Sequence, residues 1–309
     1  MPSTINEFKD DTGFERLLLD RATPLLPRSE SRAVIDLRSV GSTSVARKPV
    51  AARVDISLTD SLGSSDRGVS ADDLRPLIFG AAWKVLDLLV ELSYEMNGVP
   101  PGNGRQYLIK EKVGGVATSR VGSVPPFDSH ATLWSRLLQA YSSTTTLRNS
   151  LVHRKLIIDP STGEMMGVPK LGDLAPIPLT TAEHTAFCQA VQGAAQAVID
   201  SKLSTRRINQ LSWTLDQLTA HHGQPSLGAT AVRGIVPTVL ATAEVSQDMV
   251  TLDAGFILAR ARLAVDGVSY FDLKLYIPDG RILTGALEDA PTGMVTFPLD
   301  EPPSWLQWT

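Results

Sequence analysis

The spacing of the apolar residues differs between stretches of this chain, and that difference constrains its fold more than any other feature. Between residues 71 and 222 apolar side chains recur every three or four positions, as they do along one face of an amphipathic helix. In residues 33–58, and again from about residue 229 onward, they alternate with polar residues, as in strands. Separate blocks of helices and strands predict an α+β protein.

The pattern divides the chain into three regions. Residues 1–65 are expected to contain one short helix and two strands, at 33–37 and 50–58. Residues 66–223 are expected to form a helical domain, and residues 224–309 an antiparallel β domain. The N-terminal strands are candidates to join the C-terminal sheet. The role of the C-terminal sheet, whether substrate selection, partner docking or inhibition, is left open by the sequence.

Finer boundaries follow from turn and capping residues. The helical domain is predicted to contain helices near 71–97, 129–153 and 180–222, with a candidate break at 142–146. An insertion at 98–128, rich in Gly, Pro and Val, is expected to be a loop with at most a strand pair at 107–116, and a hairpin is expected at 155–168. The C-terminal strands are predicted at 231–240, 249–254, 256–265, 269–277 and 281–283.

Charge and composition exclude several classes of protein. With a net charge of −4, the chain is not expected to coat nucleic acid generally, because such binding requires many Lys and Arg side chains against phosphates. The single cysteine, Cys188, excludes an intrachain disulfide and a Cys-rich zinc motif. Because no signal peptide and no apolar run of about 18 residues is evident, we expect a cytoplasmic protein without a membrane span.

The most informative stretch is the segment from Leu147 to Arg154, at the end of the second predicted helix. It joins a permanent cation, an amide and an imidazole, in Arg148, Asn149 and His153. At about 100° per residue, Asn149 and His153 lie on one face of a helix, whereas Arg148 and His153 diverge by about 140°. One helix alone does not focus these two side chains on one point. A two-fold partner helix would, so the spacing also predicts a homodimer.

These residues resemble the hallmark of the HEPN superfamily of helical-bundle ribonucleases. The segment Arg148-Asn149-Ser150-Leu151-Val152-His153 fits the Arg-Asn-x-x-x-His pattern of that family. The resemblance implies a HEPN-like helical bundle and metal-independent cleavage of RNA at a composite site in a dimer, as in bacterial toxins and anti-phage defence proteins. It also implies an antitoxin or a defence-complex protein as a partner. In many such proteins the helix continues past the His, whereas residues 155–159 of this chain appear extended in the sequence pattern.

The chemistry of RNA cleavage suits these residue types. His exchanges protons near neutral pH, and Arg donates two hydrogen bonds to phosphate oxygens, so Arg148 and His153 are the predicted catalytic residues. Asn149 is predicted to orient the imidazole or to hold a phosphate oxygen. No metal and no cofactor is expected. The predicted contacts with the RNA backbone are Arg154, Lys155 and Arg136.

Three alternatives remain open from the sequence: a non-catalytic binding module, a metal-dependent nuclease, and an antitoxin-like or scaffold protein. The same string would arise from polar residues on the solvent face of a helix, as in a non-catalytic module that binds RNA or a partner. A metal-dependent nuclease could use Asp272 and Lys274 with Asp253 or Asp266. The favoured interpretation is that Asp272 and Lys274 simply lie on the polar face of an alternating strand. Cys188 is expected in the core, and His130 and His184 on the surface near helix starts.

Overall fold

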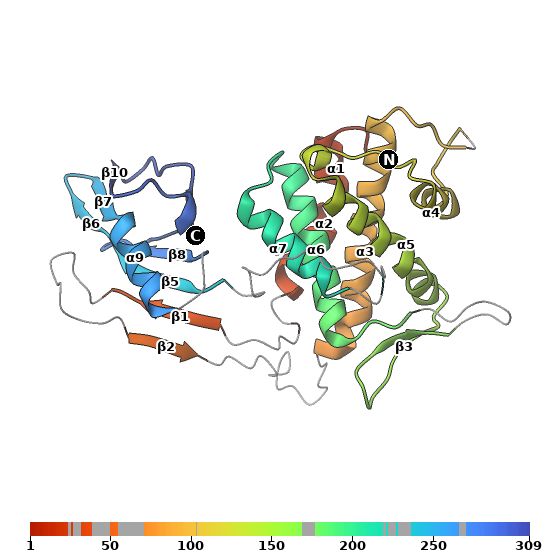
Figure 1. The fold of residues 1–309 in the computed structure, drawn as a ribbon, viewed down its shortest axis with the longest axis horizontal. Coiled ribbons are helices and arrows are strands. Elements are labelled where there is room, and N and C mark those ends of the chain that lie inside the picture. Colours follow the sequence, from red (N-terminus) through yellow and green to blue (C-terminus); the bar gives the residue numbers. More distant parts are fainter. Residues whose placement is uncertain are drawn as a thin grey trace. The chain divides into compact units, whose positions relative to one another are not determined.

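The computed structural model describes residues 1–23, 26, 32–38, 50–54, 71–102, 104–168, 177–218, 221, 227, 236–265 and 270–309. The chain divides into two compact units. The helical unit comprises Met1–Ser29 and Ser57–Ala229, and the β unit comprises Glu30–Ile56 and Thr230–Thr309. Each unit has its own cluster of buried apolar side chains. One unit is mainly helical and the other contains most of the strands, so the protein is α+β as predicted (Figure 1).

Helix α3 (Ala71–Met96) is the centre of the helical unit (Figure 1). It packs against α2 (Gly13–Ala22), α5 (Ala131–Val152) and α6 (Thr181–Ile199). Most of its apolar side chains, among them Phe79, Leu86 and Val90, are buried, as expected for a helix with neighbours on several sides. The other elements of this unit are α1 (Ile5–Asp11), α4 (Ile109–Ala117), the 3₁₀ turn η2 (Phe127–Ser129), α7 (Thr205–Asp216), and the hairpin of β3 (Leu156–Ile158) and β4 (Met165–Gly167).

The helical unit differs from the sequence-based expectation at three places. The predicted insertion at 98–128 contains helix α4 rather than a strand pair, and Glu111 accepts a hydrogen bond from the backbone of Leu108 at the start of that helix. Helix α5 is continuous through 142–146, where the hydroxyls of Thr144 and Thr145 donate to carbonyls four residues earlier within the helix. The predicted helix 180–222 is interrupted between α6 and α7, where the hydroxyl of Ser204 caps the second helix.

The β unit contains a mixed six-stranded sheet with strand order β11-β9-β8-β5-β1-β2. Strand β5 (Thr238–Thr242) runs parallel to both β1 (Arg32–Asp36) and β8 (Asp272–Tyr276). The remaining pairs in this sheet are antiparallel and add β2 (Val50–Val54), β9 (Ile282–Ala286) and β11 (Leu306–Trp308). The prediction of a purely antiparallel domain is therefore wrong, whereas the N-terminal strands do join the C-terminal sheet.

The connection from β5 to β8 explains the parallel pairing, because parallel neighbours require a long crossover. It includes β6 (Glu244–Ser246), β7 (Met249–Asp253) and α9 (Ala254–Ala264), and β7 also pairs with β10 (Met294–Pro298). The strand predicted at 256–265 is thus wrong: residues 256–264 lie in α9, which buries Ile257 and Ala261 at helical spacing, and Val265 is its C-cap. Asp253 initiates the helix by accepting a hydrogen bond from the backbone of Phe256.

The N-terminal region predicted as one unit, residues 1–65, contributes to both units. Helices α1 and α2 belong to the helical unit, and strands β1 and β2 belong to the β unit. Among the described helices, none is long and apolar enough to cross a membrane.

Candidate active site

Helix α5 ends at Val152, and His153 is its C-cap residue, as the sequence predicts. The chain leaves the helix through a left-handed residue, Arg154, with φ of 56°. The backbone N–H of Arg154 donates to the carbonyl of Leu151 at 3.1 Å, and that of Lys155 donates to the carbonyl of Ser150 at 2.7 Å. This pair of hydrogen bonds is a Schellman motif. It turns the chain abruptly into the β3–β4 hairpin and leaves the imidazole of His153 exposed at the end of the helix.

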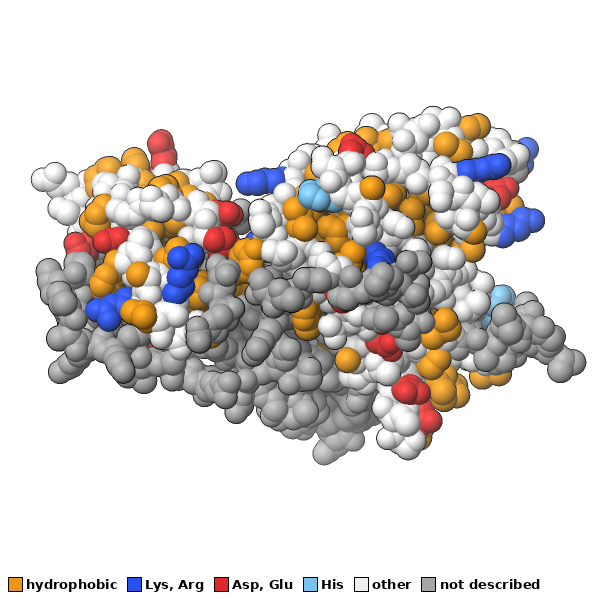
Figure 2. All heavy atoms as spheres, in the orientation of Figure 1, with side chains coloured by type: hydrophobic (Ala, Val, Ile, Leu, Met, Phe, Trp, Pro, Cys, Tyr) orange, Lys and Arg blue, Asp and Glu red, His pale blue; other side chains and the backbone are white. Residues whose placement is uncertain are grey.

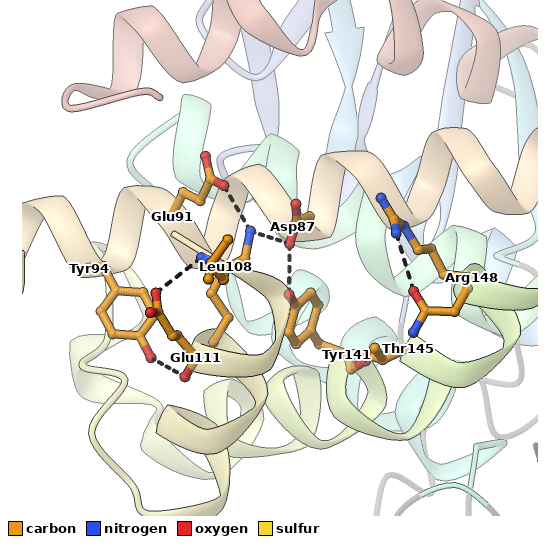
Figure 3. A network of polar contacts seen from close by, with 10 residues as sticks. Asp87, Glu91, Tyr94, Leu108, Glu111, Tyr141, Thr145 and Arg148 are labelled. Atoms are coloured by element: carbon orange, nitrogen blue, oxygen red, sulfur yellow. Dashed lines mark hydrogen bonds and ion pairs between the residues drawn. The ribbon is translucent and has the colours of Figure 1, made fainter. Parts of the chain in front are cut away.

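Arg148 lies one and a half turns before His153 and is half-buried. Its guanidinium packs on Trp83 of α3, with Cζ 5.0 Å from the centroid of the ring. Nη1 donates to Oδ1 of Asn149 at 3.2 Å, as Figure 3 shows. Within the described residues no carboxylate forms an ion pair with Arg148, and a guanidinium has five N–H donors in all. Donors therefore remain for a phosphate.

The structure brings Asn149 to Arg148 rather than to the imidazole. Its side-chain oxygen accepts from Arg148, and its backbone carbonyl accepts from the backbone N–H of His153 at 3.0 Å. Asn149 thus orients the guanidinium, and it contacts His153 through the main chain.

In a single chain, Arg148 is held against α3 while His153 is exposed to solvent. Five residues along an α-helix correspond to about 7.5 Å along the axis and about 140° around it. The two predicted catalytic side chains therefore do not converge within one chain.

The three residues predicted to bind the RNA backbone do not form one surface. Arg154 and Lys155 are exposed beside His153. Arg136 is only 5% exposed, so the prediction that it contacts RNA is wrong: its side chain points into the helix packing rather than to solvent. On the face seen in Figure 2, basic side chains of the helical unit are interspersed with acidic and apolar ones.

A buried polar network, which was not predicted from the sequence, lies beneath the motif (Figure 3). The ring of Tyr141 stacks on Trp83 with 5.0 Å between centroids. Its hydroxyl donates to Oδ1 of Asp87 at 2.7 Å. Lys112 of α4 donates to the same carboxylate at 2.6 Å and to Glu91 at 2.8 Å. The sequence signal was present, because Trp83, Asp87 and Glu91 are spaced by four residues and so place carboxylates within the apolar stripe of α3.

Burial and the neighbouring Asp87 carboxylate raise the pKa of Tyr141 far above its ordinary value. The phenol therefore remains protonated and acts as a donor to Asp87 at neutral pH. Lys112 is 1% exposed, so its charge is compensated almost entirely by the two carboxylates.

A second buried polar group joins α3 to α6 in the helical core. The guanidinium of Arg75 donates to the carbonyl of Gly163 and to the hydroxyl of Thr181. His184 is fully buried, so its predicted surface position is wrong; Nε2 donates to the carbonyl of Arg75 at 3.1 Å. Burial, with the nearby Arg75 charge, lowers the pKa of His184 to about 3. Cys188 is buried as predicted, and burial raises the pKa of its thiol. Both side chains are neutral and are part of the packed core.

The alternative site at Asp272 and Lys274 gains no support. Both residues lie half-buried on β8, and Asp253 instead caps helix α9. Asp266 lies outside the described residues. Throughout the part of the chain that the structure describes, no three His, Cys, Asp or Glu side chains gather as a metal site would require.

Comparison of the chain with family models, curated proteins and solved structures found no significant match. Any function must therefore be argued from the geometry of the chain's own residues.

Proposed function

We propose that this protein is a metal-independent endoribonuclease of the HEPN type, which acts as a homodimer with Arg148 and His153 as catalytic residues and Asn149 in support. The observation that carries the proposal is the end of α5. There a guanidinium with uncommitted donors and an exposed imidazole lie on one helix, in the order and spacing of the HEPN motif. The HEPN assignment rests on this motif and on the helical packing around it.

The reaction needs no group beyond these side chains and the RNA. A base removes the proton of the ribose 2′-hydroxyl, and the 2′-oxygen attacks the adjacent phosphorus. The bond from phosphorus to the 5′-oxygen breaks, and an acid protonates that oxygen. The products are a 2′,3′-cyclic phosphate and a 5′-hydroxyl. His153 would transfer the protons, and Arg148 would stabilise the additional negative charge on the phosphorane.

A dimer would supply what one chain lacks. Because Arg148 and His153 diverge around α5, the guanidinium of one protomer would meet the imidazole of its partner across a two-fold axis. Apolar side chains near His153 suit such a contact: Val152 is 57% exposed, Ile157 49% and Val168 46%. Val168 is adjacent to the motif, because its N–H donates to the carbonyl of Lys155 at 3.0 Å.

The first experiment is cleavage of single-stranded RNA in EDTA. We expect a 2′,3′-cyclic phosphate product and no cleavage of DNA, which lacks the 2′-hydroxyl. His153→Ala and Arg148→Ala should each lower kcat by at least about 100-fold. His130→Ala is the matched control, because His130 lies at the other end of α5 and should leave cleavage unchanged. RNA binding without cleavage by the unmodified protein would favour the non-catalytic binding module instead.

A mixing experiment tests whether the site is composite. A heterodimer of Arg148→Ala and His153→Ala protomers contains one complete site if the two residues come from opposite chains. Co-expression of the two inactive variants should therefore restore a substantial part of the activity. If the site lay within one chain, every site in the mixture would have one defect and no activity would return.

The biological setting follows from the family resemblance alone. We propose a role in bacterial growth arrest or anti-phage defence in the cytoplasm, with an antitoxin or a defence-complex protein as partner. Growth arrest on expression, relieved by His153→Ala, is the expected result.

A further inference from the structure

The guanidinium of Arg148 is held by an aromatic ring rather than by an acidic partner. Trp83 is 2% exposed, and its ring supports Arg148 at a Cζ-to-centroid distance of 5.0 Å. The indole Nε1 of Trp83 has no hydrogen-bond partner among the described residues. The ring therefore contributes packing and its π face rather than a hydrogen bond.

The position of this ring is fixed in turn by Tyr141. The two rings stack at an interplanar angle of 24°, and Tyr141 is fully buried. The phenol is fixed at its far end, because its hydroxyl donates to Asp87. Asp87 cannot turn away without leaving the Lys112 ammonium, which also holds Glu91. A continuous series of contacts thus runs from α4 through α3 to the motif on α5. Figure 3 shows the part of it around Asp87, Glu91 and Tyr141.

An arginine that binds phosphate must not be paired directly with a neighbouring carboxylate. A direct ion pair with Asp87 would occupy up to two donors of Arg148 and would offset its charge. Here the Asp87 carboxylate is instead engaged by Tyr141 and Lys112. The cation is therefore oriented while its donors stay available.

We propose that Trp83, Tyr141, Asp87 and Lys112 are positioning residues for Arg148: they fix its guanidinium so that it meets the phosphorane with no reorganisation. The proposal rests on the proposed ribonuclease function. Lys112 belongs to α4, which lies in the 98–128 segment. The proposal therefore gives this segment a role in the site, although none of its residues belongs to the motif.

The test compares two substitutions of Trp83 with the same two at Trp134. Trp134 is a fair control because it is also buried, also packs on an aromatic ring, and also has an indole N–H without a partner among the described residues. Trp83→Phe keeps a π face and should stay within about threefold of the original kcat. Trp83→Leu should lower kcat about 30- to 100-fold with little change in KM, because a displacement of about 1 Å can cost about 100-fold. Trp134→Phe and Trp134→Leu should not differ in this way.

A second variant addresses the case in which Trp83→Leu does not fold. Tyr141→Phe keeps the stacked ring and removes only the hydroxyl that reaches Asp87. We expect about a tenfold loss in kcat at constant KM, since a looser ring misplaces Arg148 by less than its removal does. Equal losses for Trp83→Phe and Trp83→Leu, or full activity in both, would overturn the proposal.

An NMR readout separates failure of this inference from failure of the ribonuclease function. The Nε–H signal of Arg148, assigned by its loss in Arg148→Lys, should carry an upfield ring-current shift from Trp83. The shift should disappear in Trp83→Leu and persist in Trp134→Leu. Absence of that shift in the unmodified protein overturns the positioning role whatever the activity. If the shift is present but no RNA is cleaved, the ribonuclease proposal is the part that fails.

Discussion

Removing the charge of Lys112 tests how α4 is held to the rest of the helical unit. The Lys112 side chain is 1% exposed, and its partners Asp87 and Glu91 are 19% and 11% exposed. Replacement by Met keeps the apolar stem but leaves two carboxylates facing each other without a cation. Breaking a buried ion pair typically costs about 3–5 kcal/mol. Because both carboxylates retain some contact with water, we expect a loss near the lower end, about 3 kcal/mol.

The assay is urea unfolding followed by circular dichroism at 222 nm, with three comparisons. Lys84→Met breaks the more exposed pair with Glu15, and should cost less than about 1 kcal/mol. Adding Asp87→Asn and Glu91→Gln to Lys112→Met removes the uncompensated charges and should recover about half of the loss. A loss below about 1 kcal/mol for Lys112→Met alone would show that the cluster is well solvated, and the reasoning would be refuted.

Three further predictions concern stability. Arg154 has a left-handed conformation with φ of 56°, which glycine adopts with less strain, so Arg154→Gly should raise the free energy of unfolding by about 1 kcal/mol in the same assay. A lower free energy of unfolding would contradict the strain at this position. The pKa of His184 falls from 6.5 to about 3 on folding, so between these values the unfolded chain binds one proton more than the folded chain. The free energy of unfolding should therefore decline by up to about 1.4 kcal/mol per pH unit as the pH drops from 6.5 towards 3. The decline should be less steep in His184→Gln, which lacks this group. Asp253→Ala removes the cap of α9 and should cost about 1 kcal/mol, whereas Asp253→Asn should be nearly neutral; equal losses would argue against a capping role.

The parts of the fold that depend on local pattern were predictable from the sequence. The end of α5 at His153 follows from the change to an extended pattern after Arg154, and the structure confirms both the helix end and the hairpin. The pattern at 256–265 predicts a strand wrongly, because Arg260 and Arg262 alternate with apolar residues at a spacing of two. The better signal was Asp253, a residue that begins helices.

Contacts between distant parts of the sequence could not be predicted in this way. Periodicity identifies β1, β5 and β8 as strands, but the parallel pairing of β5 with both neighbours depends on where the connections run. At the candidate site, the positions of Arg148 and His153 on one helix were predictable. The support of Arg148 by Trp83, and the reach of Lys112 across to Asp87, depend on helix packing that one sequence does not specify.

The placement of β1 and β2 has a consequence for the order of events during translation. Strand β1 pairs with β5, so it leaves the ribosome roughly 200 residues before its parallel neighbour exists. At about 5–20 residues per second, that wait is about 10–40 s. The helical unit ends near residue 229 and so is fully synthesised while the β unit still lacks most of its strands. Nascent or prematurely terminated chains would therefore contain the complete Arg148–His153 helix end before most strands of the β unit have been synthesised.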